Sequence, residues 1–271
     1  MPFVRRQSSS LLSGDRVVKV LTIAGSDPSG GAGIQADLKV FHALGAYGMA
    51  VPAALTVQNS RGVSAAYSVG PRSFAEQLEA LLIDIRPDAV KTGMLLMPWA
   101  VTAVADAVGK HRVRNLVVDP VILSSSGKVL LKPGAVKHLK KELLPLALVV
   151  TPNIPEAEVL SGMSIAGDED MDHAAGTIMD LGARYVLIKG GHREGPAVDT
   201  LYGGKTVLSF STERLKGGFH GTGCALSSAI AVFIGQGLPV EKAVEKAKRF
   251  VDKMLKKAKP VGKGRTKYFQ F

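Results

Sequence analysis

The sequence predicts an α/β fold in which helices cover both faces of a mostly parallel central sheet. Short β-branched apolar runs alternate with amphipathic helical patterns along almost all of the 271 residues. This alternation is typical of parallel sheets, whose strands are joined by crossover helices. No internal repeat and no low-complexity linker interrupts it. We therefore expect one domain over residues 17–259, with tails at residues 1–16 and 260–271.

The first strand is predicted at residues 17–24, where a β-branched run stops at Gly25. After a loop rich in Gly, Ser, Asp and Pro, residues 34–44 predict a helix. We expect its buried side to hold four apolar residues, Ile34, Leu38, Phe41 and Leu44. Residues 49–57 then predict a buried strand, and residues 63–69 predict a shorter partner strand.

The later elements follow the same alternation. In order, we expect a helix at residues 74–85, a strand at 89–92, a helix at 99–108, a strand at 115–119, a helix at 134–144, a strand at 146–150, helices at 156–160 and 171–181, and a strand at 185–188. Residues 198–202 and 206–210 predict an antiparallel pair turned at two glycines. Helices at residues 222–234 and 240–257 close the domain.

Charge and composition exclude several classes of protein. The net charge of +11 suggests nucleic acid, but the excess of Lys and Arg lies in residues 1–20 and 241–271, outside the motifs described below. We therefore expect no nucleic-acid partner. We also expect no membrane partner, because no uncharged apolar run is long enough to span a bilayer. The single cysteine excludes an internal disulfide framework and fits a reducing compartment, so we expect a cytoplasmic protein.

The two ends of the chain are expected to lie outside the folded domain. Residues 1–16 are rich in Ser and Arg and lack the apolar core of a secretory signal. We expect them to form a disordered tail, with an organellar targeting segment as the alternative. Residues 260–271 are expected to form a loose basic tail.

The most informative motif is the turn at residues 220–224, which precedes a long apolar helical run. A helix start leaves backbone N–H groups without intrahelical partners, and the helix dipole adds positive charge, so this turn predicts an anion site. The turn also carries Cys224, the one cysteine. A thiol at a helix N-terminus can have its pKa lowered from ~8.5 to between ~3.5 and ~7.5. The alternative is a structural turn with a small buried side chain.

Two common nucleotide-binding motifs do not account for the chain. Residues 31–36 fit the G-x-G-x-x-G/A spacing of dinucleotide-binding folds, but the next strand ends in Gln58 and Asn59 instead of the acidic residue that binds the ribose. No G-x-x-x-x-G-K-[ST] sequence occurs. A nicotinamide oxidoreductase and a P-loop protein are therefore set aside.

Polar residues and glycines follow the predicted strands at their carboxyl ends, where open α/β sheets bind ligands. They include Gly25, Gln58, Asp119, Asn153 and Lys189. We therefore expect the functional site at this edge of the sheet.

Seven blocks of sequence carry a resemblance to a known family. They lie, in order, at residues 24–39, 57–60, 91–95, 118–121, 151–157, 188–192 and 220–224. Together they resemble the bacterial hydroxymethylpyrimidine/phosphomethylpyrimidine kinases of the ribokinase-like superfamily, over about residues 18–257. The resemblance implies a three-layer sandwich that is usually a homodimer. It also implies that ATP, with Mg²⁺, phosphorylates 4-amino-5-hydroxymethyl-2-methylpyrimidine and then its monophosphate, for thiamine synthesis.

The same resemblance implies roles at the phosphate end of the site. Cys224 would be the base near the substrate hydroxyl. The backbone amides of Gly221, Thr222, Gly223 and Cys224 would hold the transferring phosphoryl group. Lys189 would neutralise ATP phosphate, with a solvated lysine as the alternative.

A second group would serve the nucleotide and the metal. Asn153 and Glu156 match the superfamily's N-x-x-E motif, in which Asn153 would support the phosphates and Glu156 would help to hold Mg²⁺ through water. Asp119 would belong to the same metal shell. The structural alternatives are an acidic helix start at Glu156 and a turn cap at Asp119.

The substrate side carries over to Gly25, Asp37, Gln58, Met94 and Val121. The Gln58 amide has both a donor and an acceptor for one edge of an aminopyrimidine. Met94 and Val121 would pack on the ring and its methyl group. Asp37 would orient the hydroxymethyl oxygen, with an acid on an exposed helix face as the alternative.

Two other functions stay open at this point. A pyridoxal, pyridoxine or pyridoxamine kinase of the same superfamily can share the cysteine turn. A catalytically silent pyrimidine-binding protein could keep the fold. Gln58 and Asn59 favour the pyrimidine kinase, because they resemble that branch of the superfamily.

Overall fold

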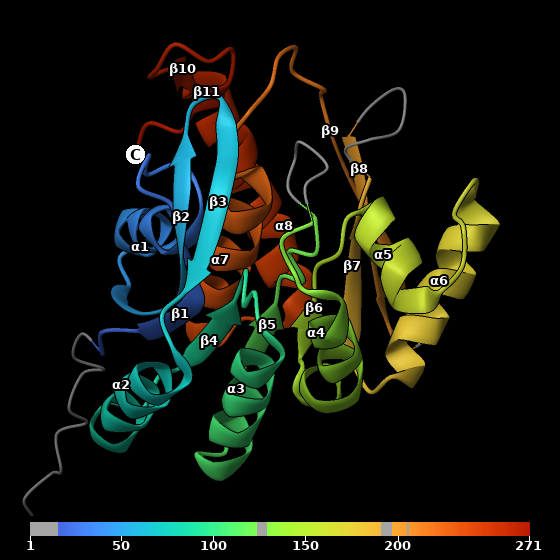
Figure 1. Ribbon diagram of the computed structural model, residues 1–271. Coiled ribbons are helices and arrows are strands. Elements are labelled where there is room, and N and C mark those ends of the chain that lie inside the picture. Colours follow the sequence, from blue (N-terminus) through green and yellow to red (C-terminus); the bar gives the residue numbers. More distant parts are fainter. Residues whose placement is uncertain (1–15, 124–128, 191–196, 205) are drawn as a thin grey trace, which may run out of the picture.

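The central feature of the computed structural model is one mixed β-sheet, drawn in Figure 1. The structure describes residues 16–123, 129–190, 197–204 and 206–271. Within these ranges, nine strands pair in the order β3-β2-β1-β4-β5-β6-β7-β8-β9. Their bounds are β1 (Lys19–Ser26), β2 (Tyr47–Asn59), β3 (Gly62–Ser68), β4 (Ala89–Thr92), β5 (Leu116–Val118), β6 (Val149–Val150), β7 (Tyr185–Lys189), β8 (Ala197–Gly203) and β9 (Thr206–Thr212). All pairings from β2 to β7 are parallel, while β3 and β8 run antiparallel to their neighbours, which confirms the predicted mostly parallel sheet.

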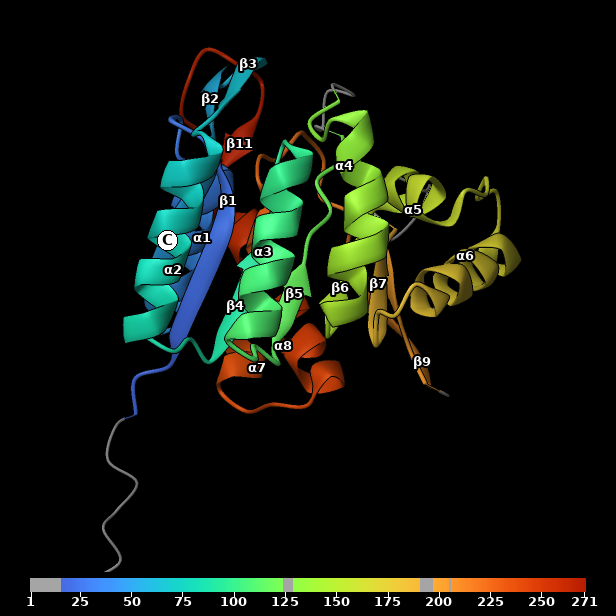
Figure 2. The same cartoon turned by 60° about the horizontal axis from the view of Figure 1, so that its bottom comes forward.

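Helices cover both faces of the sheet and make three layers (Figure 2). One face carries α1 (Gly33–Ala43), α7 (Thr222–Gly235) and α8 (Val240–Lys257), and the other carries α2 (Pro71–Asp84), α3 (Pro98–Lys110), α4 (Pro133–His138), α5 (Ile154–Ser161) and α6 (Asp168–Asp180). Alternate strand residues point to opposite faces. In β5, Val117 packs with the first group of helices, whereas Leu116 and Val118 pack with the second. The central strands are therefore buried on both sides, as their continuous apolar runs predict.

The buried side of α1 differs from the sequence-based expectation. Its buried residues are Ala36, Asp37, Val40 and Phe41. Of the four predicted residues only Phe41 is among them, since Ile34, Leu38 and Leu44 are only half-buried. Leu38 and Leu44 still pack against the core cluster that contains Phe41, and Asp37 is buried because it finds a cationic partner, Lys91, inside the domain. A pattern of apolar residues cannot reveal a buried acid of this kind.

The helix predicted at residues 134–144 is also modified. After α4 the chain forms one π-helical turn, Leu139–Leu143, and one 3₁₀ turn, Leu144–Leu146. Pro145 lies in the 3₁₀ turn and has no N–H to continue a regular helix. The strand predicted at residues 146–150 is shortened to Val149–Val150 as a result.

The C-terminal segment is packed against the domain, which corrects the expected loose basic tail. Residues Lys259–Pro260 (β10) and Lys267–Tyr268 (β11) pair in antiparallel fashion. Tyr268 and Phe269 are buried, and Phe269 joins the core beside α7 and α8. The Lys267 backbone also exchanges hydrogen bonds with Gly218 and His220. Aromatic side chains therefore fix this segment while its lysines stay at the surface.

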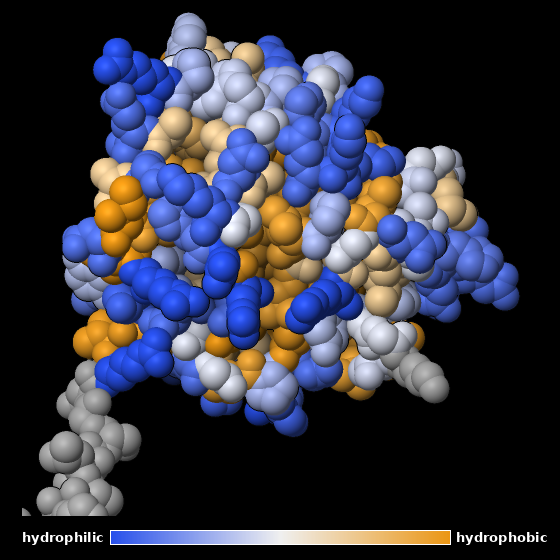
Figure 3. Space-filling model, turned by 90° about the horizontal axis from the view of Figure 1, so that it is seen from below, coloured by the Kyte–Doolittle hydropathy of each residue, from blue (hydrophilic) through white to orange (hydrophobic). Residues whose placement is uncertain are grey.

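The carboxyl ends of the strands and the loops that follow them lie at the top in Figure 1. The opposite end, seen from below in Figure 3, shows apolar side chains scattered between hydrophilic ones. In the part of the chain that the structure describes, no helix combines the length and the apolar character needed to cross a bilayer. The predicted tail at residues 1–16 lies outside the described residues, apart from Arg16.

Candidate active site

The N-terminus of α7 is the centre of the candidate site. Its N-cap is Gly221, which has the left-handed backbone conformation (φ 75°). A Cβ at this position would lie 1.8 Å from the carbonyl oxygen of Gly31, so only glycine fits. The first N–H groups of α7 have no partner within the helix, and Thr222 and Gly223 are only half-buried. The turn therefore offers backbone donors and positive dipole charge to an anion.

A lysine–carboxylate cluster lies beside this turn. The Nζ atom of Lys189, at the end of β7, is 3.0 Å from Oδ1 of Asp119 and 3.9 Å from Oε2 of Glu156. A Cβ on Gly223 would lie 3.2 Å from the same Nζ atom. Asp119 also accepts hydrogen bonds from Thr151 and Ser227. The three strand ends after β5, β6 and β7 thus bring predicted residues together beside the start of α7.

Burial and charge act in opposite directions on this cluster. Burial alone would lower the pKa of Lys189, but the carboxylates of Asp119 and Glu156 outweigh it and raise that pKa. The ammonium group is therefore charged at neutral pH. Burial raises the pKa of Glu156, and nearby Asp119 adds to this, while Lys189 opposes it.

Glu156 is held by the start of α5. Its backbone N–H donates to Asn153, and its carboxylate accepts from the Asn153 backbone N–H at 2.9 Å, which completes a capping box. The other carboxylate oxygen accepts the N–H of Ile122 at 3.1 Å. The structural role weighed from the sequence, a helix start with an acid in its first turn, is therefore present.

The donor set around Lys189 bears on metal binding. Each oxygen of Glu156 already accepts a backbone N–H group, so the carboxylate is held in place by the capping box and by Ile122. Among the described residues, no group of three or more His, Cys, Asp or Glu side chains could hold a metal ion. Mg²⁺ keeps several waters and uses phosphate oxygens as ligands, so carboxylates such as Asp119 and Glu156 fit a metal held through water.

Asp37 does not face the cleft, contrary to the prediction that it orients the substrate hydroxymethyl group. Its side chain is fully buried and lies 2.9 Å from Nζ of Lys91. The carboxylate also accepts hydrogen bonds from Thr22 at 2.6 Å and from Ser228 at 2.7 Å. With its oxygens occupied by these three partners, Asp37 ties α1 to β1, β4 and α7.

Cys224 lies between the two lysine–aspartate pairs. The backbone N–H of Gly33 donates to its sulfur, and Lys91 lies near enough to favour the thiolate. Burial nevertheless raises the pKa of Cys224 to about 11, and the charges of Asp37 and Asp119 act in the same direction. The expected depression of this pKa is therefore wrong for the protein without ligands. The helix N-terminus does not offset the loss of water around the sulfur.

Three of the predicted substrate residues form an apolar corner. A Cβ on Gly25 would meet the Met94 methyl group at 2.4 Å, so the glycine leaves room for that side chain. Met94 packs in a small cluster with Ala54, and Val121 is a partly buried member. Val121 has a positive φ of 42°, which is strained for a β-branched residue. Such strain is often stored at functional sites.

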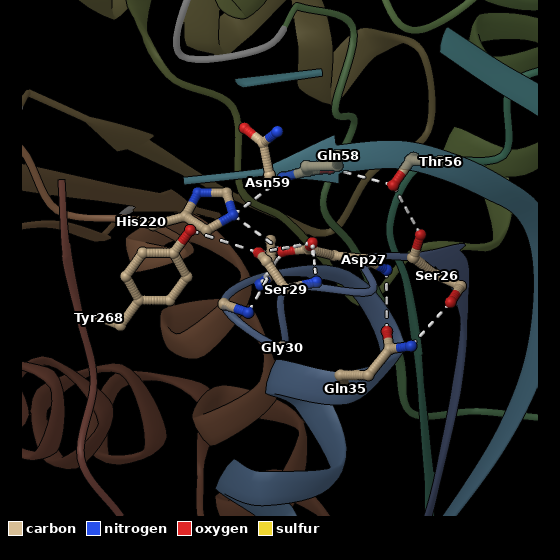
Figure 4. Close-up of polar contacts among 12 residues, drawn as sticks. Ser26, Asp27, Ser29, Gly30, Gln35, Thr56, Gln58, Asn59, His220 and Tyr268 are labelled. Carbon is tan, nitrogen blue, oxygen red and sulfur yellow. Dashed lines mark hydrogen bonds and ion pairs between the residues drawn. The ribbon is translucent and has the colours of Figure 1, made fainter. Parts of the chain in front are cut away.

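Gln58 belongs to a polar cluster with Thr56, Asp27 and His220 (Figure 4). Its carboxamide lies between the Thr56 hydroxyl, at 3.1 Å, and the ring of His220, at 2.9 Å. His220 also contacts the buried carboxylate of Asp27 at 2.8 Å. No role was predicted for Asp27, His220 or Thr56, although Asp27 and His220 lie in motifs that were noted from the sequence. An Asp in a Gly/Ser-rich loop is a signal of a turn that its side chain stabilises.

A cavity of about 380 Å³ opens from the α7 turn toward α8. Its polar end includes Asn153, Lys189 and Gly223, and its apolar end includes Leu226, Val251 and Leu255. A charged end beside an apolar end suits a ligand that has phosphates on one side and a flat ring on the other.

Comparison with known proteins agrees with this geometry. Residues 27–268 match the family model described as phosphomethylpyrimidine kinase. The chain is 49% identical over 247 residues to the thiamine biosynthesis bifunctional protein ThiED of Geobacter sulfurreducens, covering 90% of this chain but 50% of that relative. The chain therefore spans about half the length of that relative. It is 46% identical over 250 residues to a hydroxymethylpyrimidine/phosphomethylpyrimidine kinase of Rhizobium meliloti, covering 90% and 94% of the two chains.

Solved structures share the fold as well. A phosphomethylpyrimidine kinase from Clostridium difficile superposes with a TM-score of 0.80 at 43% identity, over 88% of this chain and 99% of that one. An ADP complex of Bacillus subtilis pyridoxal kinase superposes with a TM-score of 0.87 at 35% identity, over 94% and 97%. The three-layer α/β architecture is thus that of known small-molecule kinases.

Proposed function

We propose that this chain, which belongs to the phosphomethylpyrimidine kinase family, transfers the γ-phosphoryl group of ATP to 4-amino-5-hydroxymethyl-2-methylpyrimidine and then to its monophosphate. The observation that carries the proposal is that Lys189, Thr222 and Gly223 line one cavity at the start of α7, where the next residue of the helix is Cys224. Phosphoryl transfer needs alignment and charge neutralisation more than covalent chemistry.

The α7 turn and Lys189 would hold the phosphates. Backbone N–H groups aimed at the transferring oxygens stabilise charge without reorganising during the reaction. Lys189 keeps its charge because Asp119 and Glu156 raise its pKa. Asn153, which lines the cavity, would support the phosphates, and the apolar end formed by α7 and α8 would receive the adenine.

Mg²⁺ would be held by ATP phosphates and by water bound to Asp119 and Glu156, and it would neutralise charge between the phosphates. Glu156 would position that water while its carboxylate keeps the capping box closed. Asp119 also holds Lys189 in place, at 3.0 Å.

Cys224 would accept the proton of the substrate hydroxyl. With its pKa raised to about 11, only a small fraction is thiolate at neutral pH. In a loose transition state a small thiolate fraction can suffice, because the substrate hydroxyl can keep its proton until late in the transfer. The rate should therefore depend on pH well above neutrality.

The substrate ring would lie in the corner made by Gly25, Met94 and Val121, with one edge on Gln58. Met94 and Val121 present apolar surface to the ring. The Gln58 amide offers a donor and an acceptor to the amino group and the ring nitrogen of the pyrimidine.

Phosphorylation of pyridoxal, pyridoxine or pyridoxamine is the second candidate, favoured by the high structural similarity to Bacillus subtilis pyridoxal kinase. Those alcohols have the same hydroxymethyl group on a flat ring. The Gln58 edge favours the aminopyrimidine over them, because both of its polar functions find partners there.

We further propose a homodimer in the cytoplasm. The β2–β3 hairpin exposes Leu55, Val57 and Tyr67, three large apolar side chains on neighbouring strands. Exposed apolar patches of this kind mark interaction surfaces, and a second copy of the chain would cover it. A reducing compartment suits a chain whose one cysteine must stay a free thiol.

The direct test is mass-spectrometric detection of products from the pyrimidine alcohol, ATP and Mg²⁺. The proposal expects a monophosphate first and a diphosphate afterwards, with ADP formed in step. Faster turnover of pyridoxal in a parallel reaction would favour the second candidate. Tight binding of the pyrimidine without any ADP would favour a silent binding protein.

A further inference from the structure

The polar cluster in Figure 4 has more hydrogen bonds than contact with a substrate alone would require. The carboxylate of Asp27 accepts the backbone N–H and the hydroxyl of Ser29 on one oxygen. Its other oxygen accepts the N–H groups of Gly31 and Ala32 and faces Nε2 of His220 at 2.8 Å. Asp27 is 2% exposed. A buried carboxylate with four donated hydrogen bonds is an acceptor only, so the proton in the fifth contact belongs to His220 Nε2.

This proton restricts the neighbouring carboxamide. His220 Nε2 also lies 2.9 Å from the side-chain nitrogen, Nε2, of Gln58. Nitrogen at that end would set two donors against each other. The two ends of a carboxamide have nearly the same shape, so hydrogen-bond partners decide which end is oxygen.

Thr56 settles the choice from the opposite end of the amide. Its hydroxyl has one proton, which it donates to the carbonyl oxygen of Ser26 at 2.8 Å. It can therefore only accept at its 3.1 Å contact with Gln58. Both conflicts are relieved when the Gln58 oxygen faces His220, where it shares the Nε2 proton with Asp27 in a bifurcated hydrogen bond, and the nitrogen faces Thr56.

We propose that His220, anchored by Asp27, is a positioning residue that fixes the orientation of the Gln58 carboxamide. One N–H and one oxygen lone pair of Gln58 then remain for the substrate, in a single arrangement. The inference rests on the proposed function in one respect, that Gln58 contacts the aminopyrimidine edge. It makes His220 a determinant of specificity for the 4-amino group, acting through Gln58.

The C-terminal segment holds His220 in this position. The His220 backbone N–H donates to the carbonyl oxygen of Lys267 at 3.0 Å. The Tyr268 ring meets the imidazole edge-on, with 5.2 Å between centroids. A Cβ on Gly31 would meet His220 at 2.3 Å, so glycine is needed for the close approach. The ring is therefore fixed from three sides.

The test compares two alcohols, the aminopyrimidine and its analogue without the 4-amino group. For wild type, kcat/KM favours the aminopyrimidine. His220→Phe keeps a ring against Tyr268 but has no N–H, so this preference should fall about tenfold, while the KM for ATP is unchanged. His220→Gln restores a donor and should recover part of the preference. A preference that is unchanged in His220→Phe would overturn the proposal.

Two further variants keep the test decisive. His111→Phe removes a histidine at the end of α3 that also pairs with a carboxylate, that of Glu79 on α2, at 2.9 Å, and it should leave the preference unchanged. If His220→Phe does not fold, Thr56→Val removes the acceptor at the other end of the amide and should lower the preference as well. A Thr56→Val enzyme with the wild-type preference would contradict the inference.

Neutron diffraction on the free enzyme separates this inference from the proposed function, because it locates the deuterons of Gln58 directly. Deuterons facing Thr56 support the positioning role, and deuterons facing His220 overturn it. If wild type phosphorylates neither alcohol, the proposed function fails, and this measurement still decides the amide orientation.

Discussion

Two buried lysine–aspartate pairs, both next to Cys224, differ in one respect. Lys91 and Asp37 lie 2.9 Å apart with both side chains 0% exposed, and Thr22 and Ser228 complete the carboxylate's hydrogen bonds. Lys189 and Asp119 lie 3.0 Å apart, but the lysine keeps 15% of its surface open to the cleft. The first pair is closed on all sides, and the second has one side free for a ligand.

The difference separates structure from chemistry. The charges of the closed pair satisfy each other and join α1, β1, β4 and α7, so its loss should appear as instability. In the open pair, Lys189 can contact phosphate oxygens as well as Asp119. The loss of this lysine should therefore appear as lost activity. Each lysine also favours the thiolate of Cys224, so both pairs set the electrostatics around the sulfur.

Breaking the closed pair should give the largest effect. Lys91→Met leaves the Asp37 charge buried without a cation, which costs about 3–5 kcal/mol of unfolding free energy. Urea denaturation measures it. The double variant Asp37→Leu/Lys91→Met removes both charges and should recover much of the loss. Equal instability of the single and double variants would show that the charge imbalance is not the cause.

Breaking the open pair should act on catalysis. Lys189→Met removes the cation that faces the phosphates, so kcat/KM for ATP should fall about 10²- to 10³-fold, or about 3–4 kcal/mol. The free energy of unfolding should also fall, because Asp119 and Glu156 are buried, but by less than in Lys91→Met, because the site is open to the cleft on one side. A stability loss as large as that of Lys91→Met would remove the distinction between the pairs.

This distinction also marks where the sequence stops being informative. Both lysines follow β-branched residues at strand ends, and the order of strands and helices was predictable, down to the bounds of β4 and α8. Lys91 is closed off because it is paired with Asp37 of α1 inside the domain. An apolar pattern does not encode the burial of that acid.

Two other predictions, the loose C-terminal tail and the low pKa of Cys224, were wrong because they also depend on long-range contacts. Residues 260–271 look polar, yet Tyr268 and Phe269 supply enough apolar surface to fix them against His220 and the core. The environment of Cys224 was also unpredictable, because the helix N-terminus is visible in the sequence and the burial that outweighs it is not.

The pH dependence of the reaction tests how the two pairs and burial set the ionisation of the Cys224 thiol. A group with its pKa raised to about 11 is protonated below that pH, so the thiolate fraction grows about tenfold per pH unit up to that value. The kcat should therefore keep rising between about pH 7 and 9. Cys224→Asp supplies a carboxylate that is already ionised and should flatten the profile. A wild-type plateau near neutrality would mean that the bound substrates lower this pKa.

Two glycine substitutions give the smallest and best-matched effects. A Cβ on Gly93 would lie 3.0 Å from Lys91 Nζ and 3.0 Å from the Ala24 Cβ, in an enclosed space. Gly93→Ala should therefore cost about 1–3 kcal/mol of stability. A Cβ on Gly223 would lie 3.2 Å from Lys189 Nζ, which has open space to move into. Gly223→Ala should change stability by less than about 0.5 kcal/mol and raise the KM for ATP instead.

Thermal unfolding and steady-state kinetics on the same two preparations make this comparison. Gly93→Ala should retain the wild-type KM for ATP once it is folded. A loss of stability in Gly223→Ala but not in Gly93→Ala would contradict the conclusion that the Lys91–Asp37 pair is closed and the Lys189–Asp119 pair is open.

The account depends on where the transferring phosphate binds. A crystal structure with a non-hydrolysable ATP analogue and the pyrimidine alcohol tests this directly. We expect the γ-phosphorus at the backbone amides of Gly221–Cys224, with Lys189 on its oxygens and the alcohol oxygen facing the sulfur of Cys224. A γ-phosphorus bound away from the start of α7, with Lys189 still paired only to Asp119, would contradict it.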